Sequence, residues 1–396
     1  MSIYKFSELI EEVNEYNTEL QYGLNDIVGV TIEKGLMPTI ANLTQTPLDK
    51  FYLVEPNTFV YNPRTHGVRI GMGYNQTNTT FITSWNNFAF RVKSSVSNIL
   101  NPDYLWLYFN RSEWDRETNF KAWGSSTIVF SWDIFMDMTI KLPPRTFQDT
   151  VVRQYKVIND RIELKKRIND NLEAQAKTYF NSVFNEFAVL SNTEKTPDLK
   201  LPEDWYFAKV GDYCDYNIAN LSKADQFSTI LYLDTGSITQ NYIIELQELD
   251  ADKDEIPSRA KRRVFDRDIV YSTVRPNLCH YGLIQSPPDN LIASTGFAVL
   301  HSKGTEVSNE FLYMWLTRTS VLEYLQTIAE NSVSTYPSLN VEDLLNVRIV
   351  VPDDAILSKL NHILQTIYNA IAENNRQISL LERSKSFLLP KLFSSH

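Results

Sequence analysis

Side chains able to bind nucleic acid gather at two places in the sequence. The first group surrounds a turn in the first 100 residues and consists of Arg64, His66, Arg69, Asn75, Gln76, Asn78 and Lys93. The second group lies in the second half and consists of Arg259, Lys261, Arg262, Arg263 and Arg275. Arg, Asn and Gln can pair with base edges in the major groove, and Arg and Lys also bind phosphates. These residues are our candidates for contact with DNA.

The second group has another interpretation. Arg259–Arg263 follows the acidic run Asp250–Glu255, and the two runs could balance each other in a charged surface loop over 246–263. Arg275 precedes Pro276 and could instead hold the end of a strand. The residues leave these alternatives open.

Catalytic motifs are absent from the sequence. It contains no Gly-rich dinucleotide fingerprint, phosphate-binding loop, HExxH or Asp-Pro-Pro-Tyr motif. The five histidines are scattered, and Asp250, Asp252, Asp254 and Glu255 lack the glycine and final glutamate of a calcium loop. Two cysteines, Cys214 and Cys279, are too few for a disulfide framework or a zinc site. We therefore predict a chain without catalysis, metal or cofactor of its own.

The negative charge is concentrated in two parts of the chain. The formal net charge is −10, with −4 in residues 1–142 and −9 in 191–351, against +2 in 143–190 and +1 in 352–396. A DNA-binding chain this acidic needs local basic patches or a partner that contacts phosphates. No apolar run approaches the length of a membrane span, and the acidic start lacks a signal-peptide core. We expect a cytoplasmic protein without membrane contact.

Two segments that could position these residues read as long helices. Residues 143–184 and 352–393 align without a gap at a shift of 209 residues. Each would be roughly 60 Å long at ~1.5 Å per residue. Helices of this length favour a coiled coil or a strut, and each is the simplest partner for the other.

Both long segments carry a largely apolar heptad seam in the same phase. The seam of the first includes Ile158, Ile162, Lys165 and Leu172, and that of the second includes Ile367, Ile371, Asn374 and Leu381. Lys165 and Asn374 are equivalent positions, and a polar seam residue can fix the register of a coiled coil at some cost in stability. We predict that the two helices pair as an antiparallel coiled coil.

The repeat extends into the parts before each helix. Val60-Tyr61 matches Val270-Tyr271, Phe88-Ala89 matches Phe297-Ala298, and Tyr104-Leu105 matches Phe311-Leu312. Short strand-like runs broken by Gly, Pro and Asn, with one helix, indicate α/β (α+β) folding in each part. The predicted order is a domain over 1–142, a spacer helix over 143–190, a domain over 191–351 and a spacer helix over 352–396, with a polar linker at 191–205. Within these parts we also expect a helix over 1–22, a strand over 128–142 and one helix over 311–325.

The chain resembles the specificity subunits of type I restriction–modification systems. The resemblance is carried by DIVYSTVRPN (268–277), ASTGFAVL (293–300), Pro-Ser-Leu-Asn at 337–340 and ISLLERSKSFLLPKL (378–392). It is looser in TFVYNPR (58–64), NNFAFRV (86–92) and KLPPRTFQDTV (141–151). The first half has Asn62-Pro63-Arg64 where the second has Arg275-Pro276, so the two domains differ at that turn.

This resemblance implies a non-catalytic DNA-specificity subunit. Two target-recognition domains would each read half of a split target in double-stranded DNA, and the coiled coil would set the distance between them. The expected partners are two methyltransferase subunits and motor–nuclease restriction subunits, which would bring S-adenosylmethionine, ATP and magnesium. The alternatives are a coiled-coil-spaced adaptor that binds protein or glycan, and an enzyme of unrecognised type.

Overall fold

The computed structural model of the 396-residue chain describes residues 2–39, 43, 46–65, 69–122, 128–184, 200–222, 224–304, 306–332 and 336–394. His66 and most of the predicted linker, 191–199, lie outside these ranges. The chain divides into two compact units, one formed by Met1–Glu163 with Ser379–His396 and the other by Leu164–Ile378. Each unit therefore contains one globular part and a piece of both long helices.

The globular part of the first unit is built on an antiparallel four-stranded sheet in the order β2-β9-β6-β7. These strands span Ile10–Glu12 (β2), Phe59–Thr65 (β6), Ile70–Tyr74 (β7) and Phe88–Val92 (β9). The other strands form the pairs β1–β10 (Ser2–Lys5, Thr139–Leu142), β3–β4 (Val28–Val30, Leu36–Pro38) and β5–β8 (Tyr52–Val54, Phe81–Thr83). The helices before the long one are α1 (Phe6–Leu9), α2 (Pro102–Phe109), α3 (Ser112–Lys121) and α4 (Trp132–Asp137).

The globular part of the second unit repeats this plan. Its sheet β12-β21-β18-β19 has the same order of elements and spans Cys214–Tyr216, Phe297–Ser302, Asp268–Ser272 and Tyr281–Ile284. The pair β11–β22 (Tyr206–Lys209, Arg348–Val351) corresponds to β1–β10. Its helices are α6 (Val210–Tyr213), α7 (Asn309–Leu316), α8 (Thr319–Glu330) and α9 (Val341–Leu345).

The two globular parts differ in their remaining strands. The second carries another four-stranded sheet, β16-β13-β20-β17, with strands Gln247–Asp250, Thr229–Leu233, Leu291–Ser294 and Ala260–Arg263. It also has the small hairpin β14–β15, Ile238–Thr239 with Tyr242–Ile243. Outside its main sheet and the β1–β10 pair, the described residues of the first part form the two-stranded pairs β3–β4 and β5–β8. The shared sheet is the repeated framework, and the other strands are where the two parts diverge.

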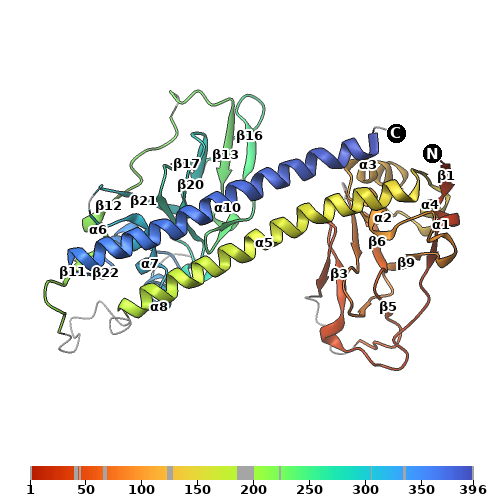
Figure 1. The fold of residues 1–396 in the computed structure, drawn as a ribbon, viewed down its shortest axis with the longest axis horizontal. Coiled ribbons are helices and arrows are strands. Elements are labelled where there is room, and N and C mark those ends of the chain that lie inside the picture. The colour runs from red at the N-terminus through yellow and green to blue at the C-terminus, as the bar shows by residue number, and fades with distance from the viewer. Residues whose placement is uncertain are drawn as a thin grey trace. The chain divides into compact units, whose positions relative to one another are not determined.

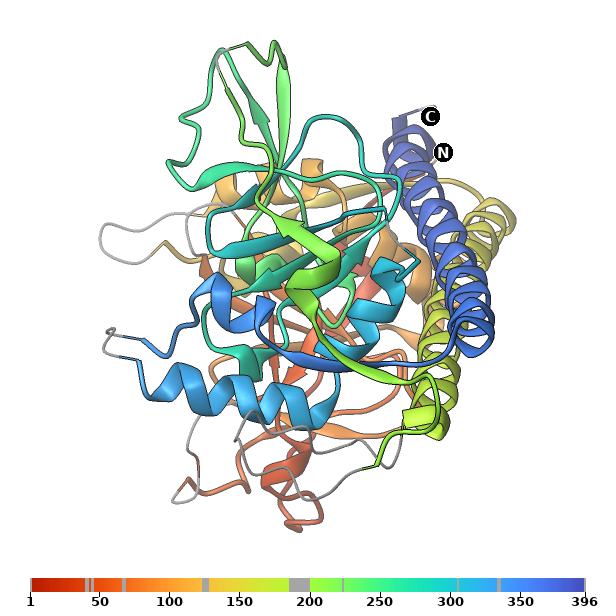
Figure 2. The same ribbon diagram turned by 90° about the vertical axis from the view of Figure 1, so that its left-hand side faces the viewer.

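The two long helices are α5 (Arg145–Phe184) and α10 (Asp354–Ser394). In the second unit their segments lie side by side and run in opposite directions (Figure 1, Figure 2). Lys165 Nζ donates to Asn374 Oδ1 at 3.1 Å, and Asn374 Nδ2 donates to Asn169 Oδ1 at 2.9 Å. Lys165 therefore meets its own repeat equivalent, as expected where two equivalent antiparallel helices cross their local two-fold axis. The predicted fold class, two α/β parts with paired antiparallel helices, is confirmed.

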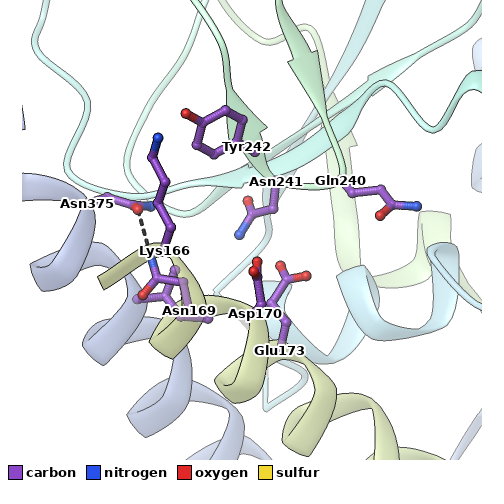
Figure 3. A pocket seen from close by; sticks show the side chains of 9 residues that line it. Lys166, Asn169, Asp170, Glu173, Gln240, Asn241, Tyr242 and Asn375 are labelled. Carbon is purple, nitrogen blue, oxygen red and sulfur yellow. Dashed lines mark hydrogen bonds between the residues drawn. The ribbon is translucent and has the colours of Figure 1, made fainter. Parts of the chain in front are cut away.

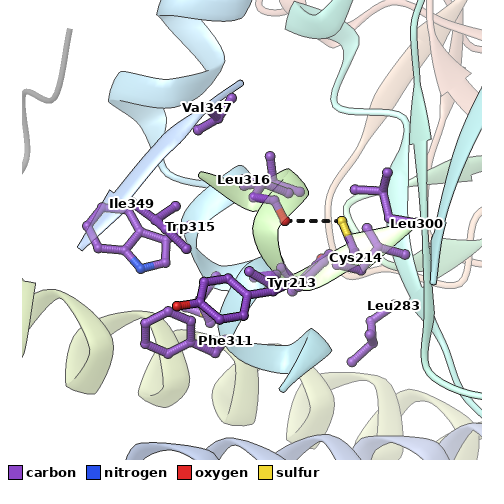
Figure 4. Packing of buried hydrophobic residues seen from close by; sticks show 14 of the residues in the cluster. Tyr213, Cys214, Leu283, Leu300, Phe311, Trp315, Leu316, Val347 and Ile349 are labelled. Atoms are coloured by element: carbon purple, nitrogen blue, oxygen red, sulfur yellow. Dashed lines mark hydrogen bonds between the residues drawn. The ribbon is translucent and has the colours of Figure 1, made fainter. Parts of the chain in front are cut away.

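Apolar side chains from α7 bind the sheet of the second unit to its helices. Phe311, Trp315 and Leu316 are buried against Tyr213, Cys214 and strand residues such as Leu300 and Ile349 (Figure 4). The first unit has an aromatic core instead, built from side chains that include Phe6, Phe59, Tyr61, Phe90, Phe109, Trp114 and Phe135. Each sheet thus has its own hydrophobic core.

Four expected elements differ from the structure. The helix predicted over 1–22 is the strand–helix–strand run β1–α1–β2, because its backbone pairs with β10 and β9. The strand over 128–142 contains helix α4 before β10, and the helix over 311–325 is interrupted between α7 and α8. The predicted charged loop over 246–263 contains β16 and β17, the two outer strands of one sheet. Charged residues are common on such edge strands, since they prevent pairing with other chains.

Candidate nucleic-acid interface

The basic residues of the second unit differ in their contacts, since some bond to neighbouring side chains and others are exposed. Arg263 pairs with Asp225 at 3.0 Å and lies near the rings of Phe227 and Phe265. Arg262 donates to Asn220 Oδ1 at 2.8 Å. Both guanidinium groups therefore fasten β17 to the segment before β13. Arg259 and Lys261 are exposed on the same edge strand and its approach, so both are placed where they can meet a phosphate.

The acidic run beside this group makes separate contacts. Asp250 pairs with Lys253 at 2.5 Å, and its N–H donates to Asp254 Oδ2 at 2.8 Å. In the part of the chain that the structure describes, no ion pair joins Asp250–Glu255 to Arg259–Arg263. The interpretation in which the two runs neutralise each other is therefore not supported by side-chain pairing.

Arg275 stands on a turn with an unusual backbone. Its φ is +49°, a backbone conformation that residues other than glycine seldom adopt. Its N–H donates to Pro337 O at 2.9 Å, and its guanidinium lies 5.0 Å from the centre of the Tyr336 ring. Both side chains are exposed. Arg275 thus has a structural backbone contact and an exposed head group, and Tyr336 is an exposed aromatic neighbour that the sequence analysis did not select.

The basic and polar group of the first unit lies at opposite ends of the β6–β7 hairpin. Arg64 and Arg69 are exposed near the closed end, where Arg69 Nε is 3.9 Å from Asp115 Oδ2. Asn75, Gln76 and Asn78 follow the far end of β7, a five-residue strand that spans roughly 17 Å. The structure therefore does not bring this group together in one short patch.

Several members of that group have structural contacts. Asn75 is 1% exposed and donates to Val54 O and Thr79 O, both at 2.8 Å, so it builds the loop after β7. Gln76 donates to Asp103 at 3.2 Å, and Lys93 Nζ donates to Ser7 O at 2.6 Å. Asn78 is exposed. Arg64, Arg69, Gln76 and Asn78 are the candidates of this group that the structure leaves exposed.

Seam residues of the two long helices are buried to different degrees. Ile162 is buried in the first unit, and Ile371 is buried in the second, where Leu172 and Ile367 are partly buried against the core. Ile158 and Leu381 are half-buried. Lys165 and Asn374 are half-buried and bonded to each other, so the two polar seam positions satisfy one another.

Each globular part also holds the end of the helix that follows the other part. In the second unit, Phe184 at the end of α5 packs 5.0 Å from the Trp315 ring and 5.8 Å from the Phe311 ring. In the first unit, Phe393 near the end of α10 packs 5.8 Å from Tyr108 and 5.1 Å from Tyr104.

These two aromatic contacts are repeat equivalents, and an arginine completes both. Arg318 lies 4.8 Å from the Trp315 ring centre and donates to Phe184 O, while Arg111 lies 3.9 Å from Tyr108 and 4.6 Å from Phe393. The duplicated sequence has therefore duplicated a docking site, one in each unit, for the end of a long helix.

A polar pocket lies beside the paired helices in the second unit. It has a volume of about 230 Å³ and is lined by α5, α10 and the turn between β14 and β15 (Figure 3). Glu173 of α5 is mostly buried there, and burial raises the pKa of its carboxyl group although Lys177 and Asn241 pull it the other way. Among the described residues, no group of three or more His, Cys, Asp or Glu side chains could hold a metal ion. No helix in the described ranges is long and apolar enough to cross a bilayer.

Comparisons with known proteins find similarity to one family. Residues 202–383 match the type I restriction modification DNA specificity domain. The chain is 26% identical over 190 residues to the HindI specificity subunit of Haemophilus influenzae, and 22% identical over 301 residues to the MjaIX specificity subunit of Methanocaldococcus jannaschii. These alignments cover 48% and 73% of this chain, but 41% and 68% of the two relatives.

A solved structure agrees with this class. The S subunit of a type I restriction–modification system from M. genitalium matches 99% of this chain and 96% of its own, with a TM-score of 0.57 at 14% identity. At that identity the match shows a shared fold. The resemblance to type I restriction–modification specificity subunits is thus confirmed in sequence by the relatives and in fold by the solved structure.

Proposed function

We propose that this chain is the DNA sequence-specificity subunit of a type I restriction–modification complex. The observation that supports this best is the duplicated docking site: within each unit, a globular part of its own kind holds the end of one of two equivalent helices. Such a chain carries two different binding surfaces on one repeated framework. Two surfaces of this kind suit a target in two unlike halves with an unspecified spacer between them.

The chemistry of methylation and cleavage belongs, in this proposal, to partner subunits. Two methyltransferase subunits would bind S-adenosylmethionine, and motor–nuclease subunits would use ATP and magnesium. Their surfaces would also close around the DNA, which makes the net charge of −10 on this chain tolerable. The assembled complex would work in the cytoplasm.

The test is an exchange of residues 1–142 for the corresponding part of another specificity subunit. We expect the methylated sequence to change in one half only, with the spacer unchanged, as read by methylation mapping of genomic DNA. Methylation of the original sequence by the exchanged chain would contradict the proposal. If the parent chain with its methyltransferase subunit showed no sequence preference on DNA, the adaptor alternative would replace it.

A further inference from the structure

The Arg267 side chain in the second unit contacts both helix α7 and the long helix α10. Arg267 immediately precedes β18 and has a φ of +63°. Its guanidinium donates to Glu310 of α7, whose side chain is 1% exposed. A second nitrogen of the same guanidinium donates to Asn369 Oδ1 of α10 at 2.8 Å. One planar head group thus bridges the globular part and the strut, a geometry that lysine cannot reproduce.

The backbone around Arg267 is also fixed. Its N–H donates to Ile284 O at 2.7 Å, and its carbonyl accepts from Asn309 Nδ2 at 2.7 Å. Gln285 follows Ile284, and its side-chain Nε2 also donates to Asn369 Oδ1, at 3.5 Å. The positive φ and these bonds hold the guanidinium in position, which limits the entropy lost in bridging two elements.

The neighbouring strand is held on the other helix. Leu283 N–H donates to Asn241 Oδ1 at 2.9 Å, and Asn241 lies beside Glu173 of α5 (Figure 3). The adjoining Tyr242 ring lies 5.6 Å from Lys166 Nζ, also on α5. The β18–β19 edge therefore meets α10 through Arg267 and α5 through the β14–β15 turn.

The first unit lacks this connection at the equivalent position. Asn57 matches Arg267 at a shift of 210 and shares its positive φ, at +67°. Its side-chain oxygen accepts from Tyr74 Oη at 3.0 Å, within the same hairpin. The bridge to the helix is thus a feature of one domain and not of the repeat.

We propose that Arg267, acting through Asn369, is a positioning residue that fixes the angle of the second globular part on the paired helices. Apolar packing already joins this part to both helices, and these polar contacts add one directional attachment on each helix, which narrows the range of angles that the packing allows. The consequence for DNA rests on the function proposed above: this angle decides which spacer length brings both recognition surfaces onto their half-sites.

The first arm of the test measures the angle in the full-length chain. Spin labels are placed at Asp252→Cys and Lys359→Cys, with Cys279→Ser to remove the partly exposed thiol. Asn369→Ala removes the bonds of Arg267 and Gln285 to the helix and leaves Arg267 paired with Glu310. The matched control is Thr366→Ala, since the Thr366 hydroxyl is exposed and bonds to His362 O of its own helix.

We expect one narrow label-to-label distance in the parent and in Thr366→Ala, and a broader distribution in Asn369→Ala. Asn369→Asp keeps an acceptor for the guanidinium and should restore the narrow distribution, which a general effect on helix stability would not do. An Asn369→Ala distribution equal to that of the parent would overturn the proposal.

The second arm measures spacer choice in the complex with the methyltransferase subunit. Duplexes carry the parent half-sites with the spacer shortened or lengthened by one base pair. Asn369→Ala should methylate the altered duplexes about tenfold better relative to the parent target, because a hydrogen bond to a charged group is worth about that factor. Altered half-sites with an unchanged spacer preference would overturn the positioning role. A parent complex without any sequence preference would refute the proposed function, while the distance arm would still decide the angle.

Discussion

The two globular parts are attached to their helices by different side chains at equivalent positions. At the start of α5, Gln148 is fully buried, accepts from Asn101 N–H at 3.0 Å, and donates to Ile99 O and Pro143 O. Its repeat equivalent at the start of α10 is Leu357, which is buried in the hydrophobic core. At the ends of the helices, by contrast, the aromatic docking site is the same in both units.

This contrast shows which features the duplication preserves. The sheet order and the aromatic docking of Phe184 and Phe393 persist in both units, and each docking site holds the end of one long helix. The contacts at the starts of the helices have changed from polar to apolar, since either can fix a helix start. We infer that the two long helices must keep matching sequences because they pair with each other. Each globular part needs only to fit the helices.

The largest expected effect comes from breaking the bridge found in one part only. Arg267→Met leaves the buried Glu310 carboxylate without its partner and should lower the free energy of unfolding by about 3–5 kcal/mol. Asn57→Ala at the equivalent position should cost about 1–2 kcal/mol, from one hydrogen bond and a strained backbone. Urea denaturation of both variants measures the difference.

Replacing both Arg267 and Glu310 separates the cost of burying an unpaired charge from the cost of lost packing. Arg267→Met combined with Glu310→Met should recover most of the lost stability, because no unpaired charge remains in the core. Equal losses for Arg267→Met and Asn57→Ala would remove the claimed difference between the two parts.

The helix starts offer a matched pair of smaller effects. Leu357→Ala should cost about 3 kcal/mol through the cavity it leaves. Gln148→Leu should cost about 2 kcal/mol, since it leaves buried backbone groups at Ile99, Asn101 and Pro143 without a partner. If Gln148→Leu were as stable as the parent in calorimetry, the polar start of α5 would be an incidental difference.

The smallest effect is a change with pH at Glu173. Burial raises the native-state pKa of this carboxyl group, so the native state binds its proton more tightly than the unfolded chain does. Stability should therefore fall as pH rises from the usual glutamate range through the raised pKa, and remain lower above it. Glu173→Gln should then gain about 1 kcal/mol at neutral pH and nothing in acid.

Glu382 is the repeat equivalent of Glu173 and is exposed, so Glu382→Gln is the control. We expect Glu382→Gln to shift the thermal midpoint little at any pH. A gain for Glu173→Gln that persists unchanged at acidic pH would show that the buried charge is not its cause.

Repetition made the strut predictable from the sequence. Phe184 and Phe393, and the pair Tyr104 and Phe311, stand out because they recur at nearly the same shift, and these residues form the docking contacts. Lys165 and Asn374 were selected as equivalent polar seam positions, and they bond to each other. A recurring residue pair thus indicated a recurring contact.

Long-range pairing explains what the sequence could not predict. Residues 1–22 have helical periodicity, but Ser2–Lys5 and Ile10–Glu12 pair with strands more than 70 residues away. Asn75 has the chemistry of a base-reading residue, yet its amide is used by its own loop. No local pattern marks Arg267 in the sequence, because its two partners lie 43 and 102 residues further along the chain. The sequence signal for this site is a pair of repeat-equivalent positions with different side chains, Asn57 and Arg267.

In the proposed function, the paired helices act as a spacer between two unlike recognition domains. Four residues inserted after Lys165 and four after Asn374 add one helical turn, about 6 Å, to each helix. Methylation mapping with the lengthened chain and its methyltransferase subunit tests the claim most directly. We predict unchanged half-sites separated by a spacer that is longer by about one or two base pairs, at 3.4 Å per step. An unchanged spacer, or altered half-sites, would contradict the account.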